Sequence, residues 1–183
     1  MLMVLMQVAS IVPPILTCLI GKRLGDPTTQ AHFQLRDFAA SLIKLVCKRF
    51  GDSSHTLRPR LTRTCLKHFM DPSKPLGTHY GALIGLAAIG GREAVRILVV
   101  PNIKLYEDVI RPALDDDSGK KQEAEMVVNS IVKVLKLLEE DVVTTGTVGD
   151  GELEKLKAKI GDIVAERVWK EGREVLVRGI LDA

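Results

Sequence analysis

The feature that most constrains the fold is an uncharged stretch, THYGALIGLAAIGG, at residues 78–91. From Tyr80 to Gly91 it has no charged residue, and it is long enough for about three helical turns. A helix that is apolar on every side has to be buried on every side. A buried strand is the alternative, but the small, unbranched side chains favour a helix. The stretch therefore predicts a central, buried helix that ends at Gly90-Gly91.

The same stretch carries a stripe of small residues. Gly81, Gly85 and Ala88 recur at i, i+4 and i+7, and so lie on one face of the predicted helix. Each glycine costs a helix interior about 1 kcal/mol relative to alanine. We therefore expect a second helix to pack very close to this face.

An internal repeat indicates the kind of helical fold. Residues 36–42 (RDFAASL) align with residues 78–84 (THYGALI) at an offset of 42, so that aromatic, small and aliphatic positions coincide. A period of about 40–47 residues with two helices per unit is typical of HEAT and armadillo repeats. A further step of 42 residues gives little agreement. The sequence predicts an all-α, HEAT-repeat-like α-solenoid of about four antiparallel helix pairs.

Length and composition agree with one helical domain. The chain of 183 residues is long enough for a sizeable core, and only 4% of it is aromatic, which leaves Leu, Val, Ile and Ala to fill that core. Residues 1–100 hold 13 Lys or Arg and 5 Asp or Glu, whereas residues 101–183 hold 13 and 18. The two halves either meet different partners or form an ordinary solvated surface. We expect a single HEAT-repeat domain over 1–183, with 141–151 as a flexible connection.

The first 21 residues carry no charge, which raises the question of a signal peptide or a transmembrane segment. No Lys or Arg precedes the run, and Pro13 and Pro14 interrupt it near its middle. We expect two short helices instead, at about 2–11 and 14–23, with a proline in the first turn of the second. Their uncovered apolar surface suggests a piece of a longer chain whose missing part covers it.

Apolar periodicity predicts the other helices. The helix expected at 31–50 has a regular amphipathic stripe formed by Leu35, Phe38, Ala39, Leu42, Leu45 and Val46. Pro101 should kink or break the helix that contains it, and Gly161 and Gly172 weaken the last helix. The remaining helices are expected at about 92–114, 120–140 and 152–180.

The helix expected at about 55–70 has two different faces. Its apolar residues recur at spacings of four and are Leu57, Leu61, Cys65 and Phe69. On the opposite side Arg60, Arg63 and Lys67 form the sharpest basic stripe in the chain. The stripe is either a solvated helix face or a contact with an acidic protein surface or with phosphate. No aromatic residue interleaves it, which argues against base stacking.

No arrangement of residues predicts an active site. The four histidines fall in four different segments, and no HExxH, GK[ST] or GxSxG motif occurs. The three cysteines lack metal-ligand spacing, and their apolar surroundings indicate buried thiols. His79 is interpreted as a satisfied histidine in or beside the core. We predict no catalytic residue, no metal site and no cofactor.

Four segments, taken in order, resemble a known family. They are VPPILTCLIGKRLG (12–25), LRDFAASLIKLVCKRF (35–50), LRPRLTRTCLKHFMDPSKPLGTHYGALIGLAAIG (57–90) and LVVPNI (98–103). Together they resemble the C-terminal HEAT-repeat domain of the histone-fold TBP-associated factor that is the sixth such subunit of the general transcription factor TFIID. The resemblance covers residues 1–115, roughly, and leaves residues 115–183 similar only in being helical.

The resemblance implies a non-catalytic scaffold in the nucleus that supports assembly of the RNA polymerase II pre-initiation complex. It implies other TBP-associated factors as partners and, in some lineages, subunits of the SAGA coactivator, with no membrane and no small-molecule substrate. In that family the domain follows a histone fold, which is absent from this chain. The alternative, from the residues themselves, is a nucleic-acid-binding helical module that contacts promoter DNA weakly through the basic stripe.

Overall fold

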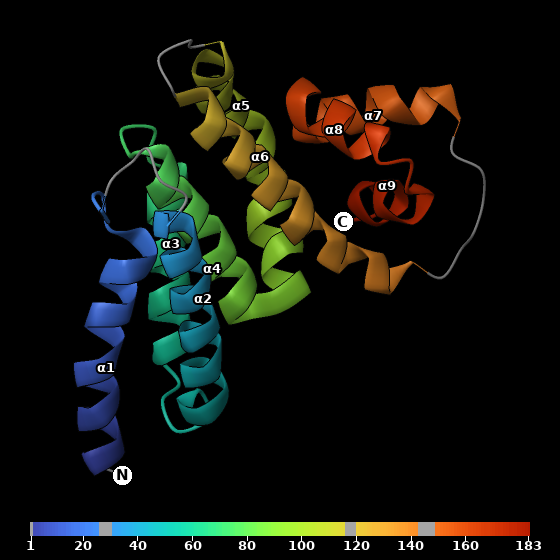
Figure 1. The fold of residues 1–183 in the computed structure, drawn as a ribbon. Coiled ribbons are helices and arrows are strands. Elements are labelled where there is room, and N and C mark those ends of the chain that lie inside the picture. The colour runs from blue at the N-terminus through green and yellow to red at the C-terminus, as the bar shows by residue number, and fades with distance from the viewer. Residues whose placement is uncertain (1, 26–30, 116–119, 143–148) are drawn as a thin grey trace. The chain divides into compact units, whose positions relative to one another are not determined.

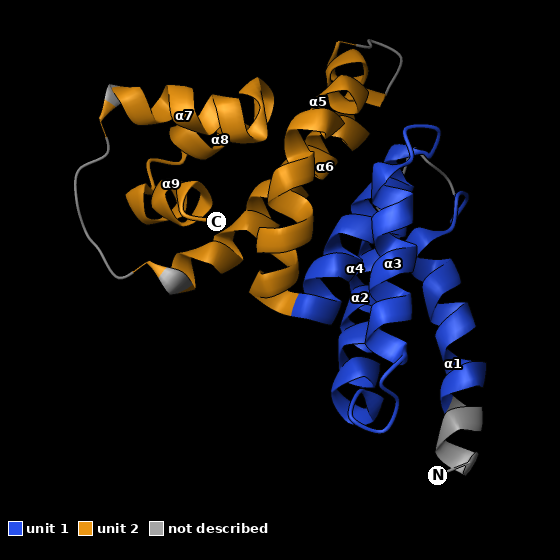
Figure 2. Ribbon diagram, turned by 180° about the vertical axis from the view of Figure 1, so that it is seen from behind, with its two compact units in different colours: residues 1–90 blue, residues 91–183 orange. Residues whose placement is uncertain are grey.

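The computed structural model describes residues 2–25, 31–115, 120–142 and 149–183 (Figure 1). Within these ranges the chain forms α-helices, one short π-helical segment and one short 3-10 segment, and no β-strand is present. The all-α prediction is therefore confirmed. The chain divides into two compact units, residues 1–90 and 91–183 (Figure 2). Of the predicted flexible connection at 141–151, residues 143–148 lie outside the described part.

Unit 1 is built from antiparallel helices, each running opposite to the one before it (Figure 1). Its described helices are α1 (Leu2–Ile20), α2 (Ala31–Phe50), α3 (Leu57–Met70) and α4 (Leu76–Ala94). The offset of 42 residues relates segment 36–42 in α2 to segment 78–84 in α4. These are the second helices of two successive pairs, α1–α2 and α3–α4, so the sequence repeat corresponds to a repeat of helix pairs.

Helix α4 is the buried helix that the sequence predicts. Every residue from Leu76 to Leu86 is buried. At Gly91 the backbone leaves helical geometry, with φ 57° and ψ −147°, which confirms the predicted end of the buried stretch. The first part of α4 is therefore a continuously buried segment, whereas Gly90, Arg92 and Glu93 near its end are exposed.

The small-residue stripe of α4 faces the end of α1 and one side chain of α3. A Cβ atom on Gly81 would lie 1.7 Å from the carbonyl oxygen of Leu19. A Cβ atom on Gly85 would lie 2.9 Å from Cδ2 of Leu19 and 3.0 Å from Sγ of Cys65. Ala88, the third member, is only half-buried. The predicted close helix contact is therefore confirmed at the two glycines.

The prediction of two short helices before residue 23 is wrong, because α1 is one helix that contains Pro13 and Pro14. A proline removes the N–H that would reach the carbonyl four residues earlier, here at Ala9 and Ser10. All four of these residues are exposed, so water can reach the two carbonyls without loss of a buried hydrogen bond. No described helix is long and apolar enough to cross a membrane.

Helix α2 buries a different face from the one that its apolar stripe predicts. Of that stripe Ala39 and Val46 are buried, whereas Leu35, Phe38 and Leu45 are exposed. The face that is buried consists of His32, Phe33, Arg36, Ala39, Ala40, Ile43, Val46 and Cys47. Hydropathy alone assigns an arginine to solvent, and for that reason the periodicity selected the wrong side of the helix.

Arg36 is buried because it satisfies the end of α1. Its guanidinium donates hydrogen bonds to the carbonyl oxygens of Leu19, at 2.7 Å from Nη1, and of Gly21, at 2.9 Å from Nη2. Thr78 of α4 donates a third bond to the Gly21 oxygen at 3.2 Å. The last carbonyls of a helix have no partner within the helix. Side chains from α2 and α4 supply those partners and fix where α1 ends.

Unit 2 begins after the break at Gly91 and continues as shorter helices. The π-helical segment Val95–Val99 ends two residues before Pro101, where the sequence predicts a kink or break. The amide of Asn102 donates to the Leu98 carbonyl at 2.8 Å and so satisfies a group near the distortion. The described helical segments of unit 2 are η1 (Val95–Val99), α5 (Val100–Leu114), α6 (Lys120–Leu135), η2 (Lys136–Asp141), α7 (Asp150–Ile160), α8 (Asp162–Lys170) and α9 (Glu174–Leu181).

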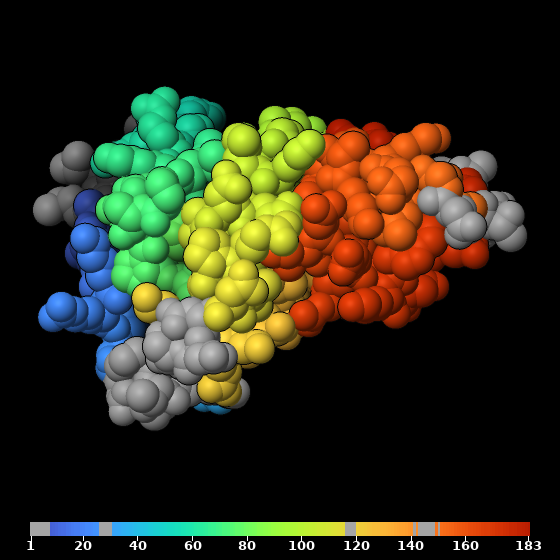
Figure 3. All heavy atoms as spheres, turned by 90° about the horizontal axis from the view of Figure 1, so that it is seen from above, coloured from blue at the N-terminus to red at the C-terminus, as the bar shows by residue number. Residues whose placement is uncertain are grey.

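The single helix predicted at about 152–180 is instead three helices, α7, α8 and α9. Gly161, between α7 and α8, has φ 81°, and Gly172, between α8 and α9, has φ 64°. This left-handed region is open to glycine and strained for other residues, so each glycine ends a helix rather than weakening it. Glu107 of α5 then accepts from the first amides of α8, Asp162 N at 2.9 Å and Ile163 N at 3.3 Å. Figure 3 shows atoms of this part of the chain, coloured orange, on the face in view.

Candidate protein-interaction surface

Helix α3 presents the basic stripe as the sequence predicts. The four apolar residues at spacings of four, Leu57, Leu61, Cys65 and Phe69, are its buried residues. Arg60, Arg63 and Lys67 are all exposed on the opposite side. The structure thus brings the three predicted site residues together on one solvent-facing surface, which we call the α3 basic face.

The α3 basic face carries uncompensated positive charge. In the part of the chain that the structure describes, no ion pair involves Arg60, Arg63 or Lys67. Like charges three and four residues apart on a helix repel each other by a few tenths of a kcal/mol, roughly. The arrangement therefore gains little within unit 1 and favours an acidic surface or phosphate outside it.

The underlying helix is held firmly on the core. The imidazole of His79 in α4 donates from Nδ1 to the Phe69 carbonyl at 3.0 Å, so the predicted satisfied histidine joins α3 to α4. Burial lowers the pKa of His79, which keeps it neutral at physiological pH. Burial also raises the pKa of the Cys65 thiol to about 12. Cys65 is therefore an inert core residue, and the chemistry of this surface comes from its three cations.

A groove that sequence reasoning missed lies beside the α3 basic face. It encloses about 320 Å³ between α1 and α3, and Arg60 is among its lining residues. Its apolar walls include Val8, Val12 and Leu16 from α1, and Leu57 and Leu61 from α3. A groove of this kind requires two helices to diverge, and no periodicity within one helix predicts it. Apolar walls beside a guanidinium are suited to a peptide that has both apolar and acidic groups.

The described residues offer no comparable arrangement for a catalytic site or a metal site. No group of three or more His, Cys, Asp or Glu side chains that could hold a metal ion occurs there. Buried polar side chains in unit 1 serve packing: the Tyr80 hydroxyl, for example, donates to Asp37 Oδ1 at 2.8 Å. Together with its burial, this bond raises the pKa of Tyr80 far above its ordinary value.

Comparisons with known proteins identify a family. A family model described as the TAF6 C-terminal HEAT repeat domain matches residues 2–104. The Schizosaccharomyces pombe protein named SAGA complex/transcription factor TFIID complex subunit Taf6 is 44% identical over 181 residues, which are 96% of this chain and 39% of that protein. Transcription initiation factor TFIID subunit 6 of Arabidopsis thaliana is 43% identical over 112 residues, 61% of this chain and 20% of that protein. The protein of the same name from Drosophila melanogaster is 32% identical over 105 residues, 57% of this chain and 17% of its own length.

These matches define what is similar and how far the similarity extends. The chain spans about two fifths or less of the length of these relatives. The likeness to the fission yeast protein covers 181 residues and so continues beyond residue 115, where the sequence motifs alone no longer indicated it. Since the family model matches more than half of the chain, the chain belongs to the family of TAF6 C-terminal HEAT repeat domains.

Proposed function

We propose that this chain is a non-catalytic scaffold within TFIID and within SAGA, where it helps to assemble the transcription initiation machinery in the nucleus. The observation that carries the proposal is the 44% identity, over 96% of the chain, to a fission yeast protein named as a subunit of both complexes. A helical-repeat fold with solvent-facing charged and apolar surfaces supports a role in binding other subunits.

The two units act together as one HEAT-repeat domain, residues 1–183, in this proposal. The identity to the fission yeast protein supports this because it extends over 181 residues and therefore through both units. The family model, in contrast, matches only residues 2–104, which include unit 1 and the beginning of unit 2.

The α3 basic face docks on an acidic surface of another subunit in this proposal. Arg60, Arg63 and Lys67 are exposed and aligned, and the apolar groove beside them adds contact area for a protein. Charged residues at the edge of an interface act mainly on the association rate and on its salt dependence. The second candidate partner, DNA phosphate, is favoured only by the positive charge itself.

A charge-reversal experiment tests the proposed function. The full-length subunit that contains this region is tagged, expressed in cells of the source organism and purified. The proteins that co-purify with it are quantified by mass spectrometry. We expect the wild-type subunit to recover TFIID and SAGA components, and Arg60→Glu/Arg63→Glu/Lys67→Glu to recover markedly less. The matched control reverses three exposed lysines of unit 2 by the same total charge, Lys133→Glu/Lys155→Glu/Lys170→Glu.

The outcomes separate the possibilities. A wild-type subunit that recovers no component of either complex would refute the proposed function. Equal losses for the α3 variant and the control would show a general effect of charge. If DNA is the partner, the α3 variant instead lowers the slope of log K against log salt by about 2.7, at about 0.9 per phosphate contact.

A further inference from the structure

Helix α2 has a second apolar line, of which Leu35, Phe38 and Leu45 are exposed to solvent and Leu42 is half-buried. Leu35, Phe38, Leu42 and Leu45 follow each other at spacings of three, four and three residues, so they form one narrow seam along the helix. Phe38 is 62% exposed and Leu45 60% exposed, the two largest exposures among the apolar residues of α2. We call these four residues the α2 seam. It is separate from the buried face of α2, which packs on the core of unit 1.

The spacing of the residues in the α2 seam is the spacing found where two helices pack against each other. Residues at alternating steps of three and four form the contact line of two-helix coiled coils and of amphipathic helices bound to a surface. The aromatic Phe38 lies next to the leucines, which is typical of the anchor of an interface. Helix α2 buries one side on the core of unit 1 and exposes an apolar line on the other side. An exposed apolar line of this kind is typical of a surface that is covered by a partner.

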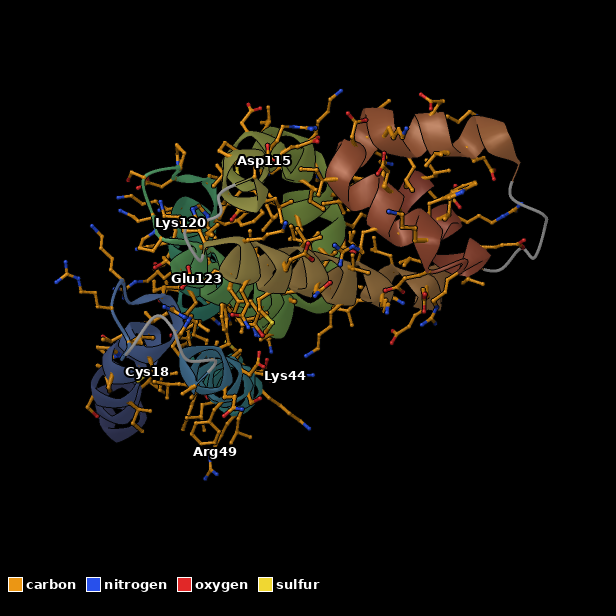
Figure 4. The ribbon with its side chains drawn as sticks, turned by 45° about the horizontal axis from the view of Figure 1, so that its top comes forward. Cys18, Lys44, Arg49, Asp115, Lys120 and Glu123 are labelled. Carbon is orange, nitrogen blue, oxygen red and sulfur yellow. The ribbon has the colours of Figure 1, made fainter. Side chains whose placement is uncertain are left out.

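The charge at the end of the α2 seam is positive. Arg49 continues the line of the seam, whereas Lys48 and Lys44 lie on one flank, about 60° and about 100° around the helix from Leu45. Lys44, Lys48 and Arg49 are exposed in the last two turns, and none has an ion-pair partner among the described residues. Figure 4 shows Lys44 and Arg49 extending outward from α2. The acid of this helix, Asp37, instead accepts a hydrogen bond from Tyr80. The first half of the exposed side is uncharged, with Gln34 and Ser41 beside the apolar residues.

We propose that the α2 seam binds an amphipathic, acidic helix of another subunit, with its Asp or Glu residues placed against Lys44, Lys48 and Arg49. The proposal rests on the scaffold function proposed above and names the partner chemistry of one further surface. A second copy of this chain is a poor occupant in either orientation. Parallel pairing would bring two basic ends together, and antiparallel pairing would place each basic end against the uncharged first half of the other seam, which offers no acid. An acidic helix satisfies the apolar line and the three cations together.

Photo-crosslinking inside the assembled complex tests this proposal. The photoreactive residue p-benzoylphenylalanine replaces Phe38 in the tagged full-length subunit, and after irradiation the crosslinked peptide is identified by mass spectrometry. We expect a segment of another subunit that has apolar residues at helical spacing and several Asp or Glu residues. A parallel substitution at Leu105, a 65% exposed leucine of α5, reports how readily any exposed apolar position in the complex is crosslinked.

Two variants connect the crosslink to the chemistry. Leu45→Glu, which places a charge within the seam, and Lys44→Glu/Lys48→Glu/Arg49→Glu should each lower the yield of the Phe38 crosslink by about tenfold, the loss typical of an anchor residue at an interface. The unit 2 control Lys133→Glu/Lys155→Glu/Lys170→Glu should leave the yield unchanged. Melting temperatures equal to that of the wild type show that all three variants fold.

Several results would overturn the proposal while leaving the scaffold function in place. They are a complex that assembles normally but gives no crosslink from Phe38, or a crosslink to a second copy of the chain, to lipid, to nucleic acid or to a segment without acidic residues. A wild-type subunit that recovers no other subunit refutes the proposed function instead. The two failures are therefore distinguished by the same purification.

Discussion

Gly81→Ala tests the closest helix contact in unit 1. A Cβ atom at this position would lie 1.7 Å from the carbonyl oxygen of Leu19 and 2.8 Å from its carbonyl carbon, whereas real Cβ atoms essentially never come within 3.0 Å of such atoms. The atoms in conflict belong to the backbone of α1, so no side-chain rotation relieves the clash. The end of α1 must therefore move away from α4.

The magnitude follows from what this movement disturbs. Arg36 donates to the same Leu19 oxygen at 2.7 Å, so displacing the oxygen weakens a buried hydrogen bond from a charged group. Overpacking costs about 1–3 kcal/mol, and loss of such a hydrogen bond costs about 1.5–3 kcal/mol. Alanine returns about 1 kcal/mol through its better helix propensity. We expect a net loss of about 3 kcal/mol, which lowers the melting temperature of a chain of this size by about 6–12 °C.

The assay is thermal and urea unfolding followed by circular dichroism. Gly151→Ala, in α7, is the matched control, because a Cβ atom there would meet nothing within 4 Å. The control should leave stability unchanged or raise it by up to about 1 kcal/mol. If Gly81→Ala melts at the wild-type temperature, the end of α1 does not pack against α4 as the structure shows, and the inference of close helix packing fails.

Three further predictions concern stability. Arg36→Met should lower the free energy of unfolding by about 3 kcal/mol in urea titration, because it removes the side-chain donor to the buried Leu19 carbonyl and one of the two side-chain donors to the Gly21 carbonyl; a midpoint unchanged from wild type would contradict this role. Glu107→Ala should cost about 1 kcal/mol, since it removes the side chain that accepts from the first amides of α8; Asp108→Ala on the same helix is the control, and equal effects would argue against the cap. Burial lowers the pKa of His79 below its ordinary value of 6.5, so the unfolded chain binds more protons below that pH, and the urea midpoint should fall from pH 7.5 to about pH 5. A midpoint that is constant over this range would show that His79 is not buried in its neutral form.

The helices of unit 1 could be predicted from sequence where the determining signal is local. Apolar spacing of four residues correctly separated the buried and exposed sides of α3, and the absence of charge correctly identified the first part of α4 as buried. The helix expected at 31–50 has those bounds in the structure. In each case the information lies within a few turns of one helix, which is the range over which periodicity operates.

The predictions from sequence were wrong or incomplete where the structure depends on a contact with another helix or on the conformation of the backbone. Pro13 and Pro14 remain inside α1, where they and the residues one turn earlier, Ala9 and Ser10, lie on an exposed side of the helix. Gly161 and Gly172 end helices because their backbone is left-handed, a property that composition does not reveal. The groove beside Arg60 requires two helices and could not be found in either alone. The exposure of the three cations, in contrast, was predictable from the single helix that carries them.

Arg36 shows how the repeat and the packing are connected. It aligns with Thr78 at the offset of 42, and both side chains donate to the carbonyl oxygen of Gly21. Positions equivalent in sequence therefore meet at one point in the structure, which explains why both are buried despite being polar. The equivalence ends two residues later, because Tyr80 is 5% exposed and Phe38 is 62% exposed. The same repeat position is thus covered in α4 and open in α2, and a helix supplied by another subunit would give Phe38 the environment that Tyr80 already has.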